Sequence, residues 1–246
     1  MIEEAIEIRT SDGTADGFLY RAEGAQRLPG VIHLTDIGGI RPSHREMAKQ
    51  LAEKGYTVLM PNVFYRTSKP PVMDVKIEMG DPRRMQRFEE LRAPLTPDAV
   101  ERDAIAYMNF LNNHSSASAG AIGVVGYCFT GAFAMRTAAA MPGKVAAVAS
   151  FHGGGLYTEE PTSPHLVLPR IKARLYFGHA TKDRSMPTEA IEKFDRALAA
   201  WGGKYESEVY DGAFHGWTTA DAPVYNQPQA ERAFEKLTEL FAGTLK

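Results

Sequence analysis

The chain has 246 residues, a formal net charge of −2 and a hydrophobic fraction of 44%. The near balance of charge, with no basic stripe, argues against a nucleic-acid surface, and the length suits one large α/β domain covering residues 1–246. One cysteine excludes an internal disulfide and fits a reducing compartment.

The first eight residues are acidic and alternate in polarity, with no basic segment followed by an apolar one. This pattern predicts no signal peptide, and no apolar run approaches the roughly 18–20 residues that span a bilayer. We therefore expect a soluble, cytoplasmic protein with no membrane partner.

The N-terminal part predicts a hairpin and then two buried strands. Residues 2–8 and 17–21 alternate in polarity around a turn signal at 11–13, which predicts an antiparallel hairpin. Continuous apolar runs at 31–35 and 57–60 predict strands that are covered on both faces.

A helix is predicted between those two strands, and a longer irregular segment after them. Ser43 and Glu46 fit a capping box that would start a helix running to about Lys54. Residues 66–97 are rich in Pro, Arg, Glu, Asp and Met, and they predict an irregular insertion with one short helix near 85–91. Such an insertion serves as a lid or binding loop, or is a solvated surface loop.

From residue 96 onward, helices alternate with strands. Thr96, Pro97 and Asp98 supply a cap, a first-turn proline and an acid for a helix whose apolar stripe ends at Leu111. Strands are expected at 121–126, 145–151, 173–178 and 205–210, and helices at 128–141, 188–201 and 229–241. The alternation predicts an α/β fold with a mostly parallel central sheet and helices on both faces.

Cys128 stands between a predicted strand and a predicted helix, in the setting Gly-x-Cys-x-x-Gly from Gly126 to Gly131. This is the layout of a nucleophile elbow with a thiol in place of a hydroxyl. The helix N-terminus would favour a thiolate, and the N–H of Phe129 would face a developing oxyanion. A free cysteine is commonly a small buried hydrophobe, but the elbow setting favours the nucleophile.

Asp183 and His215 follow in loops after later predicted strands, which gives the α/β-hydrolase order of nucleophile, acid and histidine. His215 would be the general base, and Asp183 would orient its ring. The alternative for Asp183 is a surface ion pair with Lys182 or Arg184.

These segments together resemble the dienelactone hydrolases, a branch of the α/β-hydrolases with a Cys-His-Asp triad. The resemblance covers nearly the whole chain and is carried by residues 126–131, 178–184 and 212–217, with lesser matches at 55–65 and 223–226. It implies an α/β-hydrolase fold with Cys128 as nucleophile, Asp183 as acid and His215 as base.

The resemblance also implies a carboxylate near the nucleophile, just after the first parallel strand of the core. The family usually has Glu there, whereas this chain has the shorter Asp36, and the same match makes the N–H of Ile37 the second oxyanion donor. The alternative for Asp36 is a turn residue that accepts from backbone N–H groups before the glycines.

Substrate recognition departs from the family pattern. Members that act on dienelactone are implied to hold its carboxylate with arginines, one of them four residues past the histidine, where this chain has Thr219. Arg83, Arg84 and Arg87 offer positive charge instead, although such a run is usually a solvated face.

His152 and Trp217 complete the candidate substrate-binding residues. His152 and the three glycines after it resemble the lipase oxyanion motif, but they lie downstream of the nucleophile, so we reject that match. We expect His152 to line the pocket, since it ends a predicted strand. His33, His44 and His179 show no metal-ligand spacing with Cys128, so we predict no metal and no cofactor.

The sequence therefore predicts hydrolysis of a carboxylic ester or lactone through a thioester acyl-enzyme, in a monomer or homodimer. One alternative is a non-catalytic module that binds a small molecule or a partner on the same scaffold. Another is a redox-sensing thiol, although the chain has no second cysteine to resolve it.

Overall fold

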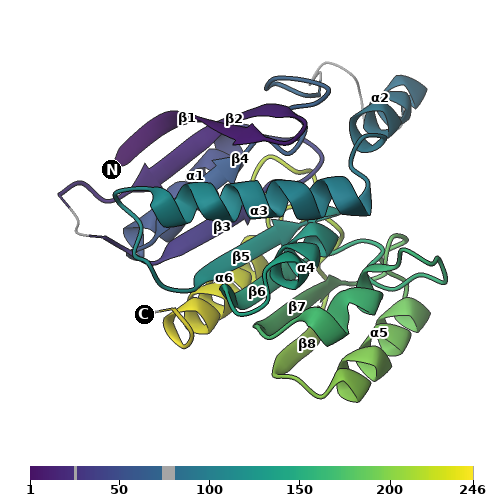
Figure 1. Ribbon diagram of the computed structural model, residues 1–246. Coiled ribbons are helices and arrows are strands. Elements are labelled where there is room, and N and C mark those ends of the chain that lie inside the picture. The colour runs from purple at the N-terminus through teal and green to yellow at the C-terminus, as the bar shows by residue number, and fades with distance from the viewer. Residues whose placement is uncertain (25–26, 74–80, 246) are drawn as a thin grey trace.

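A computed structural model describes residues 1–24, 27–73 and 81–245, and the described part contains one eight-stranded sheet (Figure 1). The strand order is β1-β2-β4-β3-β5-β6-β7-β8. The strands are β1 (Ile2–Thr10), β2 (Gly13–Arg21), β3 (Gly30–Leu34), β4 (Thr57–Pro61), β5 (Ile122–Tyr127), β6 (Val145–Phe151), β7 (Arg174–Ala180) and β8 (Tyr205–Tyr210).

The predicted N-terminal hairpin is confirmed, because β1 and β2 pair antiparallel over their full length. β2 also pairs antiparallel with β4, while β4, β3, β5, β6, β7 and β8 run parallel to one another. The fold is thus the predicted α/β-hydrolase arrangement. Its parallel strands all end at one edge, where the loops after β3, β5, β7 and β8 emerge.

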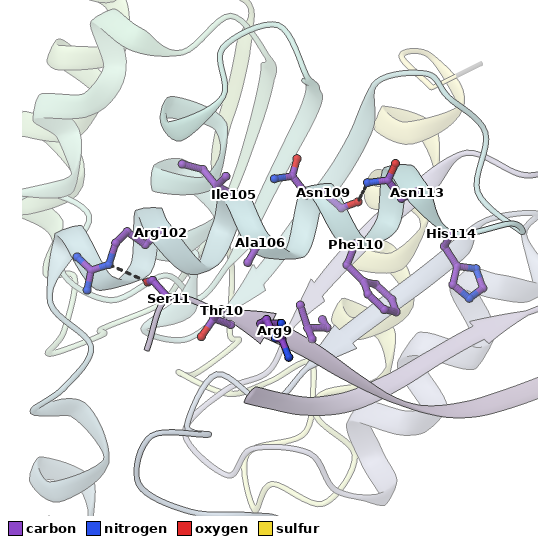
Figure 2. A pocket seen from close by; sticks show the side chains of 11 residues that line it. Arg9, Thr10, Ser11, Arg102, Ile105, Ala106, Asn109, Phe110, Asn113 and His114 are labelled. Carbon is purple, nitrogen blue, oxygen red and sulfur yellow. Dashed lines mark hydrogen bonds between the residues drawn. The ribbon is translucent and has the colours of Figure 1, made fainter. Parts of the chain in front are cut away.

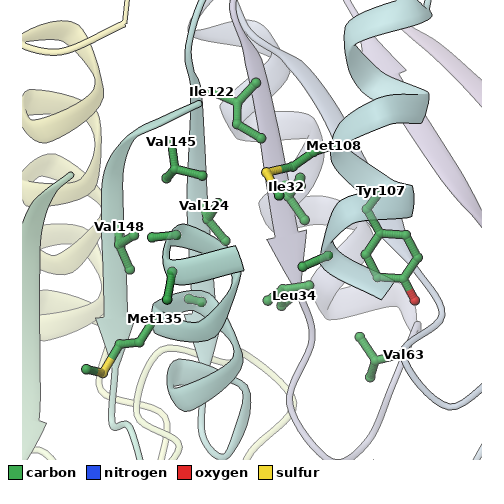
Figure 3. Close-up of a cluster of buried hydrophobic side chains, with 14 of the residues drawn as sticks. Ile32, Leu34, Val63, Tyr107, Met108, Ile122, Val124, Met135, Val145 and Val148 are labelled. Carbon is green, nitrogen blue, oxygen red and sulfur yellow. The ribbon is translucent and has the colours of Figure 1, made fainter. Parts of the chain in front are cut away.

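Helices cover both faces of the sheet (Figure 1). They are α1 (Pro42–Glu53), α2 (Pro82–Arg92), α3 (Pro97–Asn113), α4 (Thr130–Ala140), α5 (Thr188–Trp201) and α6 (Gln227–Ala242), with a 3₁₀ helix η1 (Pro164–Arg170). One core layer packs the sheet against α3, α4 and α5, and the other packs it against α1 and α6. Figure 3 shows the first layer, in which Met108 of α3 and Met135 of α4 lie over Ile32, Val124 and Val148 of the sheet.

The start of α1 differs from the prediction. The helix begins at Pro42 with Arg41 as its N-cap, and no side chain caps it, so the expected capping box of Ser43 and Glu46 is wrong. Proline is well suited to the first helical position because its φ is already helical and its missing N–H is not needed there. This shift makes Arg41, an unpredicted residue, the boundary between the loop and the helix.

The predicted insertion contains α2, which is longer than the expected helix near 85–91. It starts where Asp81 accepts the N–H of Arg83 at 2.8 Å. Residues 74–80 of the insertion lie outside the described residues, and its role as a lid stays a prediction. Among the described residues, no helix is long and apolar enough to cross a membrane.

Candidate active site

The turn between β5 and α4 presents Cys128 in a strained backbone conformation. Its φ is +59°, in the left-handed region that costs a residue with a side chain about 1–2 kcal/mol. Gly126 permits the turn, because a Cβ at this position would lie 2.2 Å from the carbonyl oxygen of Thr130. The predicted elbow is therefore present, with Cys128 half-buried at its apex.

Thr130 braces this elbow, which the sequence did not indicate. Its hydroxyl oxygen accepts the N–H of Tyr127 at 2.9 Å, and its single proton faces two acceptors, the carbonyl oxygens of Tyr127 at 2.8 Å and of Leu34 at 3.2 Å. The elbow is thereby tied to the end of β3. A glycine, which the family pattern would also allow, could not make these bonds.

Cys128, His215 and Asp183 form a continuous hydrogen-bonded chain. The Nε2 atom of His215 lies 3.1 Å from Sγ of Cys128, and its Nδ1 atom lies 2.6 Å from Oδ2 of Asp183. Ser185 holds the other carboxylate oxygen of Asp183 through its N–H at 2.8 Å and its hydroxyl at 2.7 Å. The alternative of a surface ion pair is not observed, because Asp183 is buried and its carboxylate faces His215.

The environment favours opposite charges on this histidine and this aspartate. Burial alone would lower the pKa of His215, but its hydrogen bonds and charge interactions with Asp183 and Cys128 outweigh burial and raise that pKa to about 10. Burial would raise the pKa of Asp183, but the bonds from His215 and Ser185 lower it. The imidazolium form of His215 is therefore the stable one near neutral pH.

His152 lies beneath the elbow and does not contact open solvent. Its Nδ1 atom accepts the N–H of Cys128 at 3.0 Å, and its Nε2 atom lies 2.8 Å from the hydroxyl of Thr218. Because Nδ1 accepts, the ring proton is on Nε2 and is donated to Thr218. Burial, followed by the charge of His215, lowers the pKa of His152 well below its usual value and keeps the ring neutral.

Trp217 supports the site from within the core. The indole is fully buried, stacks on Tyr210 with ring centroids 4.9 Å apart, and meets the edge of His152 at 5.1 Å. Trp217 and His152 are both covered by protein, and the substrate-binding role predicted for them stays a prediction. Ring packing after β8 turns the indole inward, and the sequence pattern could not show this.

Asp36 and Ile37 lie in the loop after β3. The carboxylate of Asp36 bonds to Arg41 through both oxygens and accepts the N–H of Gly38 at 2.8 Å. Among the described residues, its hydrogen-bond and ion-pair partners do not include Cys128. In the same part of the chain, the N–H groups of Ile37 and Phe129 donate to no protein acceptor, as an oxyanion hole requires.

The arginine of α2 that borders a cavity near the site is not one of those predicted. Arg83 pairs with Asp81, and Arg87 donates to the carbonyl of Val72 at 3.0 Å and pairs with Glu90 at 3.1 Å. Neither lines the cavity of about 570 Å³ that includes Phe129 and Gly154, whereas Arg92 does. Cys128 and His215 do not line this cavity themselves, but its Gly154 lies near the imidazole, because a Cβ on that glycine would lie 4.0 Å from Cε1 of His215.

Thr219 is fully buried at the position where the family's substrate-binding arginine would stand.

A second cavity, of about 600 Å³, lies between β1 and α3, where Phe110 and Ile105 face Arg9 and Thr10 (Figure 2). None of its lining residues belongs to the site around Cys128. Within the described residues, no group of three or more His, Cys, Asp or Glu side chains is arranged to hold a metal.

Known proteins resemble this chain over most of its length. The sequence is 30% identical to the carboxymethylenebutenolidase of Rhodococcus opacus, over 86% of this chain and 79% of that protein. It is 31% identical to the hydrolase tropI of Talaromyces stipitatus, over 76% and 70% of the two chains. A solved structure from Klebsiella pneumoniae shares the fold with a TM-score of 0.87 at 22% identity, covering 98% of both chains.

The comparison that decides the family is the match to the Dienelactone hydrolase family, which covers residues 15–245. That range includes the elbow at Cys128, the loop of Asp183 and the loop of His215. The chain therefore belongs to the dienelactone hydrolase family.

Proposed function

We propose that this chain hydrolyses a carboxylic ester or lactone through a thioester on Cys128. The observation that carries the proposal is the unbroken chain of short contacts from Sγ through the imidazole of His215 to the carboxylate of Asp183. A nucleophile bonded to a base, which is in turn oriented by a carboxylate, is the arrangement required for acyl transfer. Family membership supports the same reaction class.

Acylation requires proton transfer from Sγ of Cys128 to Nε2 of His215, 3.1 Å away, and the raised pKa of His215 favours this transfer. Sγ attacks the carbonyl carbon, and the oxyanion accepts hydrogen bonds from the N–H groups of Phe129 and Ile37. The intermediate then collapses to a thioester. The C–O bond breaks, and Nε2 of His215 gives its proton to the leaving alkoxide.

Deacylation uses the same histidine in the opposite sense. The imidazole, now neutral, takes a proton from a water molecule, whose oxygen attacks the thioester carbonyl. The second tetrahedral intermediate expels the thiolate and releases the carboxylic acid. Asp183 keeps the Nδ1–H of His215 in place through both steps and stabilises the ring whenever it is charged.

The cavity of about 570 Å³ beside Phe129 is where we place the substrate. Phe129, Phe133 and Leu95 give it an apolar wall, and Arg92 adds a positive charge at its border. One Sγ-bound acyl group and a small leaving group would fit a space of this size.

The test is turnover of an activated aryl ester by the protein and by its Cys128→Ala and His215→Gln variants. Both substitutions should lower kcat/KM by at least about 10³-fold, as loss of a nucleophile or base does elsewhere. Arg174→Gln, which removes an ion pair with Glu206 on β8, is the matched control and should keep full activity.

Intact-protein mass measured during turnover separates hydrolysis from the alternative of a binding module. The proposal requires an acyl adduct on Cys128 that disappears as the ester is consumed. A stoichiometric adduct that persists would support the binding module instead. Full activity in the Cys128→Ala variant would contradict the triad.

A further inference from the structure

We propose that Arg41 is a positioning residue that clamps the loop bearing the Ile37 amide to the loop bearing His215. In this assignment Asp36 anchors the clamp and is not a partner of the sulfur. The inference rests on the proposed function, because it takes the N–H of Ile37 as an oxyanion donor.

Arg41 joins two segments that are far apart in the sequence. Its Nη2 atom donates to Oδ2 of Asp36 at 2.8 Å, and its Nη1 atom donates to Oδ1 at 2.5 Å. Its Nε atom donates to Oδ2 of Asp221 at 2.7 Å, and Nη2 reaches Oδ1 of that residue at 3.2 Å. Asp221 lies six residues after His215, so one guanidinium holds both loops.

Asp36, which anchors the clamp, is held by further hydrogen bonds. Oδ1 of Asp36 also accepts the N–H of Gly38 at 2.8 Å, and the N–H of Asp36 donates to Nε2 of His44 at 3.3 Å. His44 is fully buried in α1, and its Nδ1 atom lies 2.9 Å from Nε2 of His33 on β3. The loop from 35 to 41 is therefore tied to the strand before it and to the helix after it.

The geometry of the clamp makes it stiff. The guanidinium packs against the loop backbone, since a Cβ on Gly38 would lie 2.5 Å from Nη1 of Arg41. Asp36 is 8% exposed, and a planar guanidinium bonded to two carboxylates has little freedom to move. Lysine could not reproduce this arrangement, because it presents a single point charge.

The elbow makes contact with the start of the same loop, which gives the clamp its proposed effect on the reaction. The hydroxyl of Thr130 lies 3.2 Å from the carbonyl oxygen of Leu34, three residues before Ile37. In the sequence, Ile37 therefore lies between Leu34, which contacts the elbow, and Arg41, which binds Asp36. An oxyanion donor acts only when it is placed accurately, and a displacement of about 1 Å can cost on the order of 10²-fold in rate.

Two reactions of Cys128 distinguish an effect of Arg41 on the oxyanion hole from an effect on the thiol itself. Ester turnover passes through an oxyanion, whereas alkylation by iodoacetamide forms an S–C bond, expels iodide and needs no oxyanion hole. For Arg41→Gln we expect kcat for an aryl ester to fall about 10- to 100-fold. The rate of alkylation should stay within twofold of the original. Arg41→Lys should recover only part of the loss.

A further variant distinguishes loss of stability from loss of positioning in Arg41→Gln. Arg41→Gln leaves the carboxylates of Asp36 and Asp221 without their shared cation, so the triple variant Asp36→Asn/Arg41→Gln/Asp221→Asn removes both charges as well. It should regain thermal stability while its kcat stays low. Arg45→Gln, on the helix that follows Arg41 but paired with Glu3, is the control and should change neither reaction.

Three outcomes would overturn the inference. They are unchanged turnover in Arg41→Gln, an equal fall in turnover and alkylation, and a changed alkylation rate in Asp36→Asn, which would place that carboxylate on the sulfur. Failure of the proposed function is recognised separately, because it would appear as turnover that survives in Cys128→Ala.

Discussion

The N–H of Cys128 donates to Nδ1 of His152 at 3.0 Å, and both residues hold a positive φ, +59° and +42°. Two strained residues from neighbouring strand ends thus fix each other. The same N–H also donates to the carbonyl oxygen of Phe151 at 3.1 Å, so the neutral imidazole of His152 is one of two acceptors that hold the backbone of the nucleophile.

Two substitutions of His152 should distinguish the contribution of its hydrogen-bond acceptor, Nδ1, from the contribution of its side-chain volume. In His152→Asn, the side-chain oxygen can accept the N–H of Cys128, and asparagine tolerates a positive φ. In His152→Leu, the N–H of Cys128 keeps only the carbonyl oxygen of Phe151 as an acceptor, and leucine tolerates a positive φ poorly. We expect the Leu variant to lose about 2–3 kcal/mol of unfolding free energy and the Asn variant about half of that.

Chemical denaturation and kcat/KM measured on the same samples check this prediction. The Asn variant should retain most of the activity, and the Leu variant should lose at least 10-fold, in the range expected for a displaced reacting group. Equal effects of the two substitutions would show that the volume of His152, and not its Nδ1 atom, is what matters.

The titration of His215 gives a second prediction. Its pKa is raised to about 10, chiefly by Asp183 and Cys128 acting against burial. Nuclear magnetic resonance of the ring Cε1–H should show the imidazolium form at pH 8, and Asp183→Asn should move the titration toward the usual value. The ring of His165, whose pKa burial lowers, serves as an internal control.

The same pKa sets the sign of a stability effect. Because the folded-state pKa of His215 lies above its unfolded value of 6.5, its contribution to stability is complete below pH 6.5 and is lost as pH rises toward 10. The difference in Tm between the protein and His215→Gln should therefore shrink over this interval. A difference that grows with pH would contradict the assigned direction.

Much of the fold could be predicted from sequence because its signals are local. Alternation of polar and apolar residues predicted the hairpin, and apolar runs between helical patterns predicted the parallel strands. The glycines around Cys128 gave the elbow, because only a residue without a Cβ fits 2.2 Å from the Thr130 carbonyl. Cys128, Asp183 and His215 were found together because each follows the end of a strand at one edge of the sheet.

The supporting contacts of the site could not be predicted, because they join residues distant in sequence. Nothing in the sequence links Arg41 to Asp221, or His152 to the N–H of Cys128. Trp217 was predicted as a candidate substrate-binding residue, whereas its indole is buried and stacks on Tyr210. The side of a loop residue that faces the site is decided by tertiary contacts.

The elbow itself provides a further prediction. Gly126→Ala should destabilise the protein by more than about 3 kcal/mol, or prevent folding, because the added methyl group meets backbone atoms that cannot move independently. Gly243→Ala is the control. Its φ is −77°, and the added Cβ would lie 3.3 Å from the carbonyl oxygen of Glu239, a contact that a shift of a few tenths of an ångström would relieve, so its Tm should fall far less than that of Gly126→Ala. A stable, active Gly126→Ala variant would show that the turn can open.

Thr219→Arg tests whether the family's arginine could simply be restored in this chain. Thr219 is fully buried, so a guanidinium introduced there must either lose its hydration or displace its surroundings. We therefore expect a loss of about 3 kcal/mol or more in unfolding free energy, without a gain in kcat/KM for a carboxylated lactone over its methyl ester. Arg92 already borders the cavity from α2. Arg92→Gln, at an exposed position, should leave stability intact while lowering any preference for the carboxylated substrate. A stable Thr219→Arg variant that gains this preference would show that the loop after His215 can turn position 219 toward the cavity.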